Sequence, residues 1–298
     1  MPTTAARLPV TLLDGGTGRE LMRIGAPFRQ PEWSALALIE APHFVTRVHQ
    51  SYVDAGADAI SANSYAVVPF HIGEDRFAAR GAELAALAGR LARGVADGAA
   101  HRVAVGGSLP PVCGSYRPDL VDIARARPIL RVLVDALEPW VDHWQAETLS
   151  ALREAELVAE LTGPTGKPLW LSFTLADDDA LAPPRLRSGE SVADAARLAQ
   201  RLGATAILFN CSQPEVMAAA VSAARAASDL AVGVYANAFP PQAADAAAND
   251  QLCDIRADLD PAGYLRFARA WYDAGATLLG GCCGIGPDHI AALRDWRG

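Results

Sequence analysis

Residues 274–283, Ala274-Gly275-Ala276-Thr277-Leu278-Leu279-Gly280-Gly281-Cys282-Cys283, contain the unit from which the fold is built. The first residues end a predicted helix, Leu278-Leu279 form a short strand, and a glycine–cysteine turn follows. The opening motif returns as Ala55-Gly56-Ala57-Asp58 and as Leu202-Gly203-Ala204-Thr205. Glycine at this position ends a helix by adopting the left-handed conformation. Each copy therefore predicts a helix that leads directly into the next strand.

Short strand-like runs and helical segments alternate along the rest of the chain. The three motifs lie 147 and 72 residues apart, near multiples of about 36 residues, which suits one strand–helix unit. The predicted strands are 10–13, 59–62, 103–105, 144–147, 169–173, 206–209, 232–235 and 278–279. The predicted helices are 41–55, 78–96, 128–141, 149–161, 192–202, 214–227, 261–274 and 287–296. Long loops are expected at 176–189 and 238–260.

Eight such units predict an α/β fold, a (β/α)8 TIM barrel, as a single domain over residues 1–298. An open doubly wound sheet is the alternative. It is disfavoured because Gly15-Gly16-Thr17-Gly18 lacks the spacing of a dinucleotide-binding fingerprint.

Composition narrows the function classes. The net charge is −8, which argues against a broad nucleic-acid footprint. The chain contains no apolar run of about 18 residues, so no membrane span is expected. Residues 1–9 lack the apolar core of a signal peptide, which predicts a cytoplasmic protein. The sequence is compatible with a monomer or a homodimer.

Polar residues and thiols end every predicted strand. In a barrel the carboxyl ends of all strands face one mouth, where active sites lie. The residues at these ends are Asp14, Asn63, Ser108, Glu147, Thr174, Cys211, Asn237, Cys282 and Cys283. They are the candidate site, together with the backbone amides near Gly15, which are suited to binding an anion.

Three of the five cysteines are candidate metal ligands. Cys211 ends the sixth strand, and Cys282 and Cys283 end the eighth. Three thiolates can occupy three tetrahedral positions on Zn²⁺ and leave the fourth open, as in a catalytic zinc site. Buried apolar packing and a vicinal disulfide are the alternatives. Cys113 and Cys253 lie in expected loops and are interpreted as incidental.

In these motifs and in their order along the chain, the sequence resembles the zinc-dependent homocysteine S-methyltransferases, which include S-methylmethionine-dependent and betaine-dependent enzymes. The matching stretches run in family order from residue 13 to residue 290. They include 13–18, 49–58, 62–65, 107–111, 147–149, 172–174, 209–211, 235–237 and 280–284.

The resemblance implies a (β/α)8 barrel with zinc on Cys211, Cys282 and Cys283, which are then the catalytic centre. It also implies that Asp14 and Glu147 hold the amino group of homocysteine, and carboxylates are the natural partners of an ammonium. Gly15, Asn63, Ser108, Thr174 and Asn237 complete the expected substrate site.

The chemistry expected is methyl transfer from a sulfonium donor to a zinc-activated homocysteine thiolate, giving methionine. S-methylmethionine is the expected donor, and S-adenosylmethionine is a weaker possibility. The aromatic residues Trp33, Tyr65, Tyr116 and Tyr235 are candidates for holding the cationic donor through cation–π contacts. No histidine is needed as a general base, and His49 and His289 are expected to be structural.

Other hypotheses about the function of this site remain open. The same scaffold can act on another thiol or on a selenol such as selenocysteine, or take the methyl group from betaine. A zinc-dependent hydrolase and a non-catalytic zinc-binding protein are the alternatives from other classes. The segment 107–116 differs from its counterpart in the best-known S-methylmethionine enzymes, so the resemblance says least about the donor.

Overall fold

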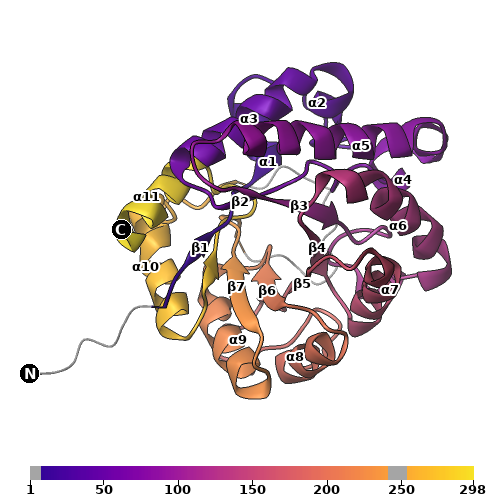
Figure 1. Ribbon diagram of the computed structural model, residues 1–298. Coiled ribbons are helices and arrows are strands. Elements are labelled where there is room, and N and C mark those ends of the chain that lie inside the picture. The colour runs from indigo at the N-terminus through magenta and orange to yellow at the C-terminus, as the bar shows by residue number, and fades with distance from the viewer. Residues whose placement is uncertain (1–7, 241–253) are drawn as a thin grey trace, which may run out of the picture.

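The computed structural model describes residues 8–240 and 254–298, and they form the predicted (β/α)8 barrel. Eight parallel strands stand in the centre, and the helices surround them (Figure 1). The strands are β1 Thr11–Leu12, β2 Ala59–Ser61, β3 Ala104–Leu109, β4 His143–Leu149, β5 Leu169–Phe173, β6 Ala206–Asn210, β7 Ala231–Tyr235 and β8 Leu278–Leu279. β1 pairs with β8, and a parallel bridge between Leu13 and Ala59 joins β1 to β2, which closes the ring.

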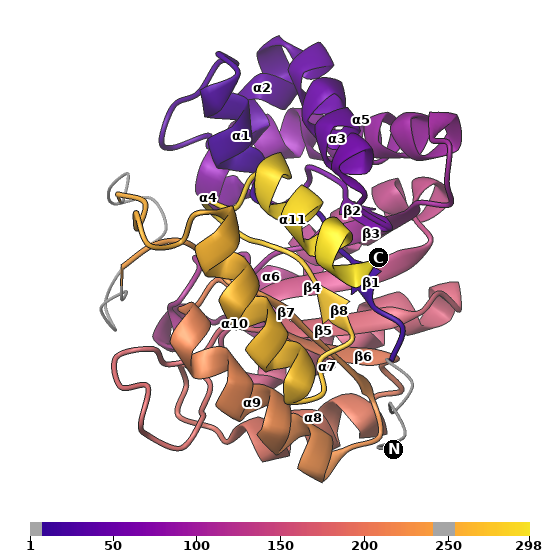
Figure 2. The same ribbon diagram turned by 90° about the vertical axis from the view of Figure 1, so that its left-hand side faces the viewer.

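Eleven α-helices cover the described part of the barrel (Figures 1 and 2). They are α1 Thr17–Arg23, α2 Ala35–Glu40, α3 Pro42–Ala55, α4 Pro69–Ile72, α5 Glu74–Gly98, α6 Ile123–Leu137, α7 Leu152–Thr162, α8 Val192–Arg201, α9 Pro214–Ala227, α10 Pro261–Asp273 and α11 Pro287–Arg297. Three 3₁₀ turns lie at Pro118–Leu120, Glu138–Trp140 and Gly163–Thr165. No helix among the described residues is long and apolar enough to cross a membrane.

The eight predicted strand–helix units are confirmed, and so is the reason for the repeated motif. Gly56, Gly203 and Gly275 have φ angles of 103°, 75° and 112°, so each ends its helix in the left-handed conformation. The strands are short but almost entirely buried, because side chains fill the barrel on the inside and the helices cover it outside.

Several predicted boundaries are wrong. The helix expected at 128–141 begins at Ile123, because the Asp122 side chain caps it by accepting a hydrogen bond from Arg125 N at 3.1 Å. The helices α1, α2 and α4 are short and were not predicted from the hydrophobic pattern.

The strands β3 and β4 are longer than predicted. β3 continues through Gly106 and Gly107, which pair with His143 and Trp144 on β4. Glycine is required at both positions, because a Cβ atom there would lie 2.9 Å and 2.8 Å from those two side chains. β4 continues to Leu149, which was expected to begin a helix, and its register with β5 shifts between Ala146 and Leu149. This irregularity places Glu147 and Thr148 at the mouth.

The long loop expected after β5 is confirmed. The β5–α8 loop contains no helix, and two isolated antiparallel bridges, Leu175 to Leu186 and Arg185 to Ser191, hold it. Part of the second expected loop, with Cys253, lies outside the described residues.

Candidate active site

A cavity opens at the carboxyl ends of the strands, where the sequence predicts the site. Eight of the ten predicted site residues line it: Asp14, Gly15, Asn63, Ser108, Glu147, Cys211, Cys282 and Cys283. The two others, Thr174 and Asn237, are fully buried and are not among the residues that line the cavity.

The three candidate cysteines meet in this cavity. Their Sγ atoms all lie within 4.8 Å of one another. The structure joins Cys211 and Cys282 by a disulfide, and Cys283 is not part of that bond. The alternative of a vicinal disulfide is therefore wrong, because Cys282 pairs across the barrel mouth and not with its neighbour. With that bond reduced, the three sulfurs are spaced to share one metal ion.

Strained backbone is concentrated around the cavity. The non-glycine residues of the described chain with positive φ are Trp33, Tyr116, Thr148 and Cys211, at 51°, 67°, 62° and 48°. All four line the cavity. Such conformations are unfavourable for residues with a Cβ atom and persist only where the surroundings impose them, typically at functional sites.

Asn210, the last residue of β6, connects the strained residue Thr148 on β4 with the strained residue Cys211, which follows it in the chain. Its Oδ1 accepts hydrogen bonds from Thr148 N at 2.9 Å and from Ser172 Oγ at 2.8 Å. Its Nδ2 donates to Thr148 Oγ1 at 2.9 Å. Asn210 is fully buried, so three neighbouring strands are held together directly below Cys211 and Glu147.

The Cys282-Cys283 turn is held in position by close backbone contacts with the loop after β1. A Cβ atom on Gly16 would lie 2.5 Å from the carbonyl oxygen of Cys282, and one on Gly15 would lie 2.3 Å from that of Ile285. The buried Tyr52 hydroxyl donates towards the carbonyls of Gly16 at 3.3 Å and Ile285 at 3.1 Å. The loops after β1 and β8 are thus fixed against each other.

Asp14 lies deep in the cavity wall. Its Oδ2 accepts a hydrogen bond from Ser61 N at 2.7 Å. Burial raises the pKa of Asp14 to about 7, the Ser61 amide opposes this rise, and the nearby Glu147 adds to it. Because the carboxylate is largely desolvated, a cationic ligand is needed to stabilise its charged form.

Glu147 has a similar environment. It accepts hydrogen bonds from the hydroxyls of Ser108 and, at 3.4 Å, Tyr235. Burial raises the pKa of Glu147 to about 7, and these hydroxyls partly oppose the rise. The cavity therefore presents two carboxyl groups that titrate near neutral pH, an arrangement suited to binding an ammonium group.

Thr174 and Asn237 lie behind the cysteines instead of facing the cavity. Thr174 Oγ1 donates to the carbonyl of Cys211 at 3.4 Å and lies 3.1 Å from Ser212 Oγ. Asn237 N donates to the Ser212 carbonyl at 3.2 Å. The Thr174 side chain and the Asn237 backbone thus contact the loop that carries Cys211, and the Asn237 side chain accepts from Phe239 N at 3.2 Å.

The four predicted aromatic residues, Trp33, Tyr65, Tyr116 and Tyr235, all line the cavity.

Two histidines, His49 and His289, are expected to have structural roles. His289 Nδ1 accepts from Gly286 N at 3.2 Å, and its Nε2 lies 2.9 Å from the Leu259 carbonyl, which is a structural role. His49 is buried, but neither ring nitrogen has a hydrogen-bond partner among the described residues, and burial lowers its pKa to about 4.

Sequence reasoning missed several residues around the cavity. They are Ser61, which binds Asp14, Thr148 with its positive φ, Tyr52, and the Asp177–Arg187 ion pair of the β5–α8 loop. Tyr52 and Thr148 lie in stretches that carry the family resemblance, but no local pattern indicates their contacts. Each of these residues acts through residues distant in sequence.

Comparison with known proteins agrees with this geometry. A family model described as homocysteine S-methyltransferase matches residues 11–296. Homocysteine S-methyltransferase of Escherichia coli K12 is 32% identical, over 96% of this chain and 94% of its own length. Selenocysteine Se-methyltransferase of Brassica oleracea var. italica is 26% identical, over 95% of this chain and 87% of its own. The crystal structure of the homocysteine methyltransferase MmuM from Escherichia coli in metallated form superposes with a TM-score of 0.79 at 28% identity, covering 97% of this chain and 96% of that one.

Proposed function

The chain belongs to the homocysteine S-methyltransferase family, and on that premise we propose that it transfers a methyl group from a sulfonium donor to the thiol of homocysteine, giving methionine. The observation that carries the proposal is the meeting of three cysteine sulfurs and two desolvated carboxyl groups in one cavity.

The carboxyl groups of Asp14 and Glu147 would bind the ammonium of homocysteine. Asp14 is buried and Glu147 is half-buried, and desolvation raises the pKa of each. The positive charge of the ligand would therefore stabilise both carboxylates. The Gly16 amide is already used, because it donates to the Ile285 carbonyl at 2.9 Å. The Gly15 amide, next to Asp14 in the chain, would bind the substrate carboxylate. Held at both groups, the substrate would extend its thiol towards the cysteines.

We propose that Cys211, Cys282 and Cys283, in their reduced state, hold zinc. Tetrahedral Zn–S bonds of about 2.3 Å place sulfur atoms roughly 3.8 Å apart, which fits a group whose sulfurs all lie within 4.8 Å. The ion would lower the pKa of the homocysteine thiol, so that a nucleophilic sulfur exists at neutral pH.

The donor site would be formed by the aromatic side chains Trp33, Tyr65 and Tyr116, whose faces attract a cationic methyl donor. In the reaction a C–S bond forms to the homocysteine sulfur as the methyl–sulfonium bond breaks. The positive and negative charges neutralise each other, so a cavity that excludes water favours the transition state. S-methylmethionine is the proposed donor, and S-adenosylmethionine or betaine is the alternative.

A selenol such as selenocysteine is the second candidate acceptor. The similarity to a selenocysteine Se-methyltransferase supports it, and it would use the same carboxyl groups and metal site. It is distinguished by comparing kcat/KM for the two acceptors with one donor.

The test is methionine formation followed by mass spectrometry. Reduced, zinc-loaded protein is mixed with deuterium-labelled homocysteine and, separately, each of the three donors. Labelled methionine is expected with S-methylmethionine, and it should disappear with Cys283→Ser, which should also lose zinc. Cys113→Ser is the matched control, because Cys113 is a free cysteine outside the sulfur cluster. No labelled methionine with any donor, from protein that holds one zinc, would refute the proposed reaction.

The protein is proposed to act in the cytoplasm, where reducing conditions keep the cysteines available to the metal. It would act as one domain over residues 1–298, as a monomer or a homodimer, on small molecules and without nucleic acid.

A further inference from the structure

The β5–α8 loop carries a buried ion pair that the proposed reaction does not use. Arg187 Nη2 lies 2.9 Å from Asp177 Oδ1, and the two side chains are 5% and 0% exposed. Burying two charges is unfavourable unless their geometry and further hydrogen bonds compensate. The remaining contacts of this pair lead to two separate parts of the cavity wall.

The first contact reaches the aromatic wall. Arg187 Cζ lies 4.8 Å from the centre of the Tyr116 ring, within the range of a cation–π interaction. Tyr116 lines the cavity and has a φ of 67°. Because a left-handed tyrosine is held in place only by its surroundings, the guanidinium is one of the groups that orient this ring.

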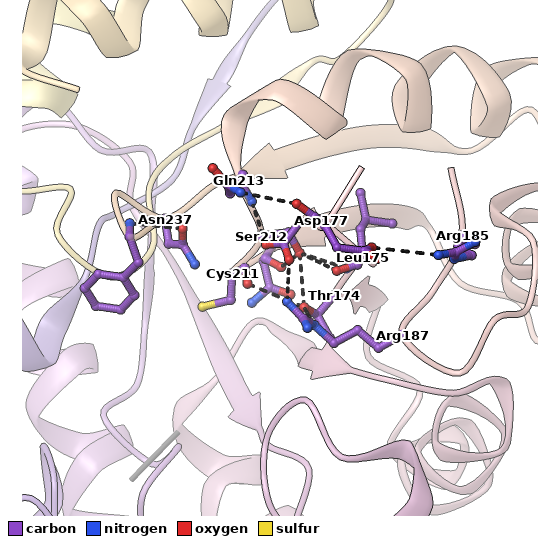
Figure 3. A network of polar contacts seen from close by, with 12 residues as sticks. Thr174, Leu175, Asp177, Arg185, Arg187, Cys211, Ser212, Gln213 and Asn237 are labelled. Carbon is purple, nitrogen blue, oxygen red and sulfur yellow. Dashed lines mark hydrogen bonds and ion pairs between the residues drawn. The ribbon is translucent and has the colours of Figure 1, made fainter. Parts of the chain in front are cut away.

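The second contact reaches the loop that carries Cys211. Asp177 Oδ2 accepts from Gln213 N at 3.2 Å, and Gln213 Nε2 donates back to the Asp177 carbonyl at 3.2 Å. Arg187 Nε donates to Thr174 Oγ1 at 3.4 Å, and Thr174 Oγ1 in turn donates to the Cys211 carbonyl at 3.4 Å. In Figure 3 these groups form one cluster, and the Cys211 sulfur points away from it.

The loop after β7 reaches the same point. Arg256 Nη1 donates to Gln213 Oε1 at 2.9 Å, and Arg256 N donates to the Ala238 carbonyl at 2.9 Å. Both long loops therefore meet at Gln213, two residues beyond Cys211. The ion pair supports the strained backbone of Cys211, whose φ is 48°, from behind.

We propose that Arg187 is a positioning residue that couples the donor wall to the metal site. Locked by Asp177, its guanidinium orients Tyr116 on one side and stabilises the 211–213 peptide on the other. The inference rests on the proposed function, because it takes Tyr116 as part of the donor site and Cys211 as a metal ligand.

The test compares Arg187→Met with Arg187→Lys in the full chain. Zinc affinity is measured by competition with a chromophoric chelator, and kcat and KM are measured for donor and acceptor separately. Arg187→Met should weaken zinc binding several-fold and raise the donor KM by about ten-fold, with a smaller change in the acceptor KM.

Lysine supplies a charge for Asp177 but lacks the planar group that stacks on an aromatic ring. Arg187→Lys should therefore restore zinc affinity and leave the donor KM raised. If Arg187→Met proves insoluble, Arg187→Lys still provides the test, because it should combine near-wild-type zinc affinity with a raised donor KM. A general loss of stability would not produce that combination.

The matched control is Arg93→Met, which removes a 2.6 Å ion pair with Asp142 at the start of β4, at the opposite end of the barrel. The inference is overturned if the Arg187 variants match this control in zinc affinity and donor KM. An inactive wild-type enzyme would refute the proposed function instead, and the zinc-affinity comparison would still test the coupling of Arg187 to Cys211.

Discussion

At the scale of single residues, the two carboxyl groups of the cavity combine a proposed binding role with a cost to stability. Asp14 is buried and Glu147 is half-buried in the cavity wall, and desolvation raises both pKa values to about 7. The surrounding hydroxyls and the Ser61 amide only partly replace water. A ligand ammonium would complete their environment, so these residues are arranged for a bound state and not for the stability of the free protein.

Glu147→Gln should therefore stabilise the fold while it weakens acceptor binding. The pKa of Glu147 rises from 4.5 to about 7 on folding. Between these values the folded protein binds more protons than the unfolded chain, so the wild type loses stability as pH rises through this window. The variant has no such loss and should gain up to about 3 kcal/mol relative to wild type above pH 7. Its KM for homocysteine should rise about 10- to 100-fold.

The measurements are urea midpoints of the metal-free proteins at pH 5 and pH 8, and acceptor KM values of the zinc-loaded enzymes. Glu160→Gln is the matched control, because Glu160 pairs with Arg127 on the surface. A stability difference that is the same at both pH values would contradict the proposed origin of the effect.

At the scale of elements, the turn after β8 is placed by its neighbour after β1. Gly16 lets the two loops touch through their backbones, and Tyr52 bonds to both. The positions of Cys282 and Cys283 therefore depend on residues more than two hundred positions earlier in the chain.

Gly16→Ala should disturb the metal site. The added methyl group would meet the Cys282 carbonyl at 2.5 Å, so the turn must move and the three sulfurs lose their common spacing. We expect zinc affinity and kcat/KM to fall by at least about ten-fold, for a displacement costing roughly 1–3 kcal/mol. Chelator competition and steady-state kinetics measure both.

Gly94→Ala is the control, because nothing lies within 4 Å of a Cβ atom at Gly94 in α5. That change should leave zinc binding intact and stabilise the helix by up to about 1 kcal/mol. Equal zinc affinities for the two alanine variants would show that the close approach at Gly16 is unimportant.

At the scale of the whole molecule, the barrel is closed by few backbone contacts. β1 and β8 are two residues each. Asp58 supports this closure, since its carboxylate accepts from Leu12 N at 2.8 Å and pairs with Arg297 near the end of α11. One side chain thus links the first strand, the start of the second strand and the last helix, at the end of the barrel opposite the cavity.

Asp58→Ala should lower stability without altering catalysis. Losing the bonds to Leu12 N and Arg297 should cost about 1–3 kcal/mol, measured as a lower urea midpoint, while kcat and both KM values stay near wild type. Asp97→Ala is the control, because Asp97 is exposed and pairs with Arg93 at the surface, so its loss should change stability by less than about 1 kcal/mol. A large fall in kcat for Asp58→Ala would contradict the separation of the two barrel ends.

Much of this organisation was predictable from the order of residues alone. The alternation of strands and helices, with glycine at the helix ends, predicts eight parallel units and a closed barrel. Because such a barrel brings all carboxyl strand ends to one mouth, the meeting of Cys211, Cys282 and Cys283 with Asp14 and Glu147 also followed.

Only the tertiary structure decided which strand ends face the cavity and how the site is held. Thr174 and Asn237 follow predicted strand ends and were expected at the mouth with Glu147, yet they lie behind the Cys211 loop. The left-handed backbones of Thr148 and Cys211 and the buried Asp177–Arg187 pair have no local signature. The physical reason is that hydrophobic periodicity is a local property of the chain. Strained backbone and buried charge, in contrast, are unfavourable locally and exist only because distant parts of the fold stabilise them.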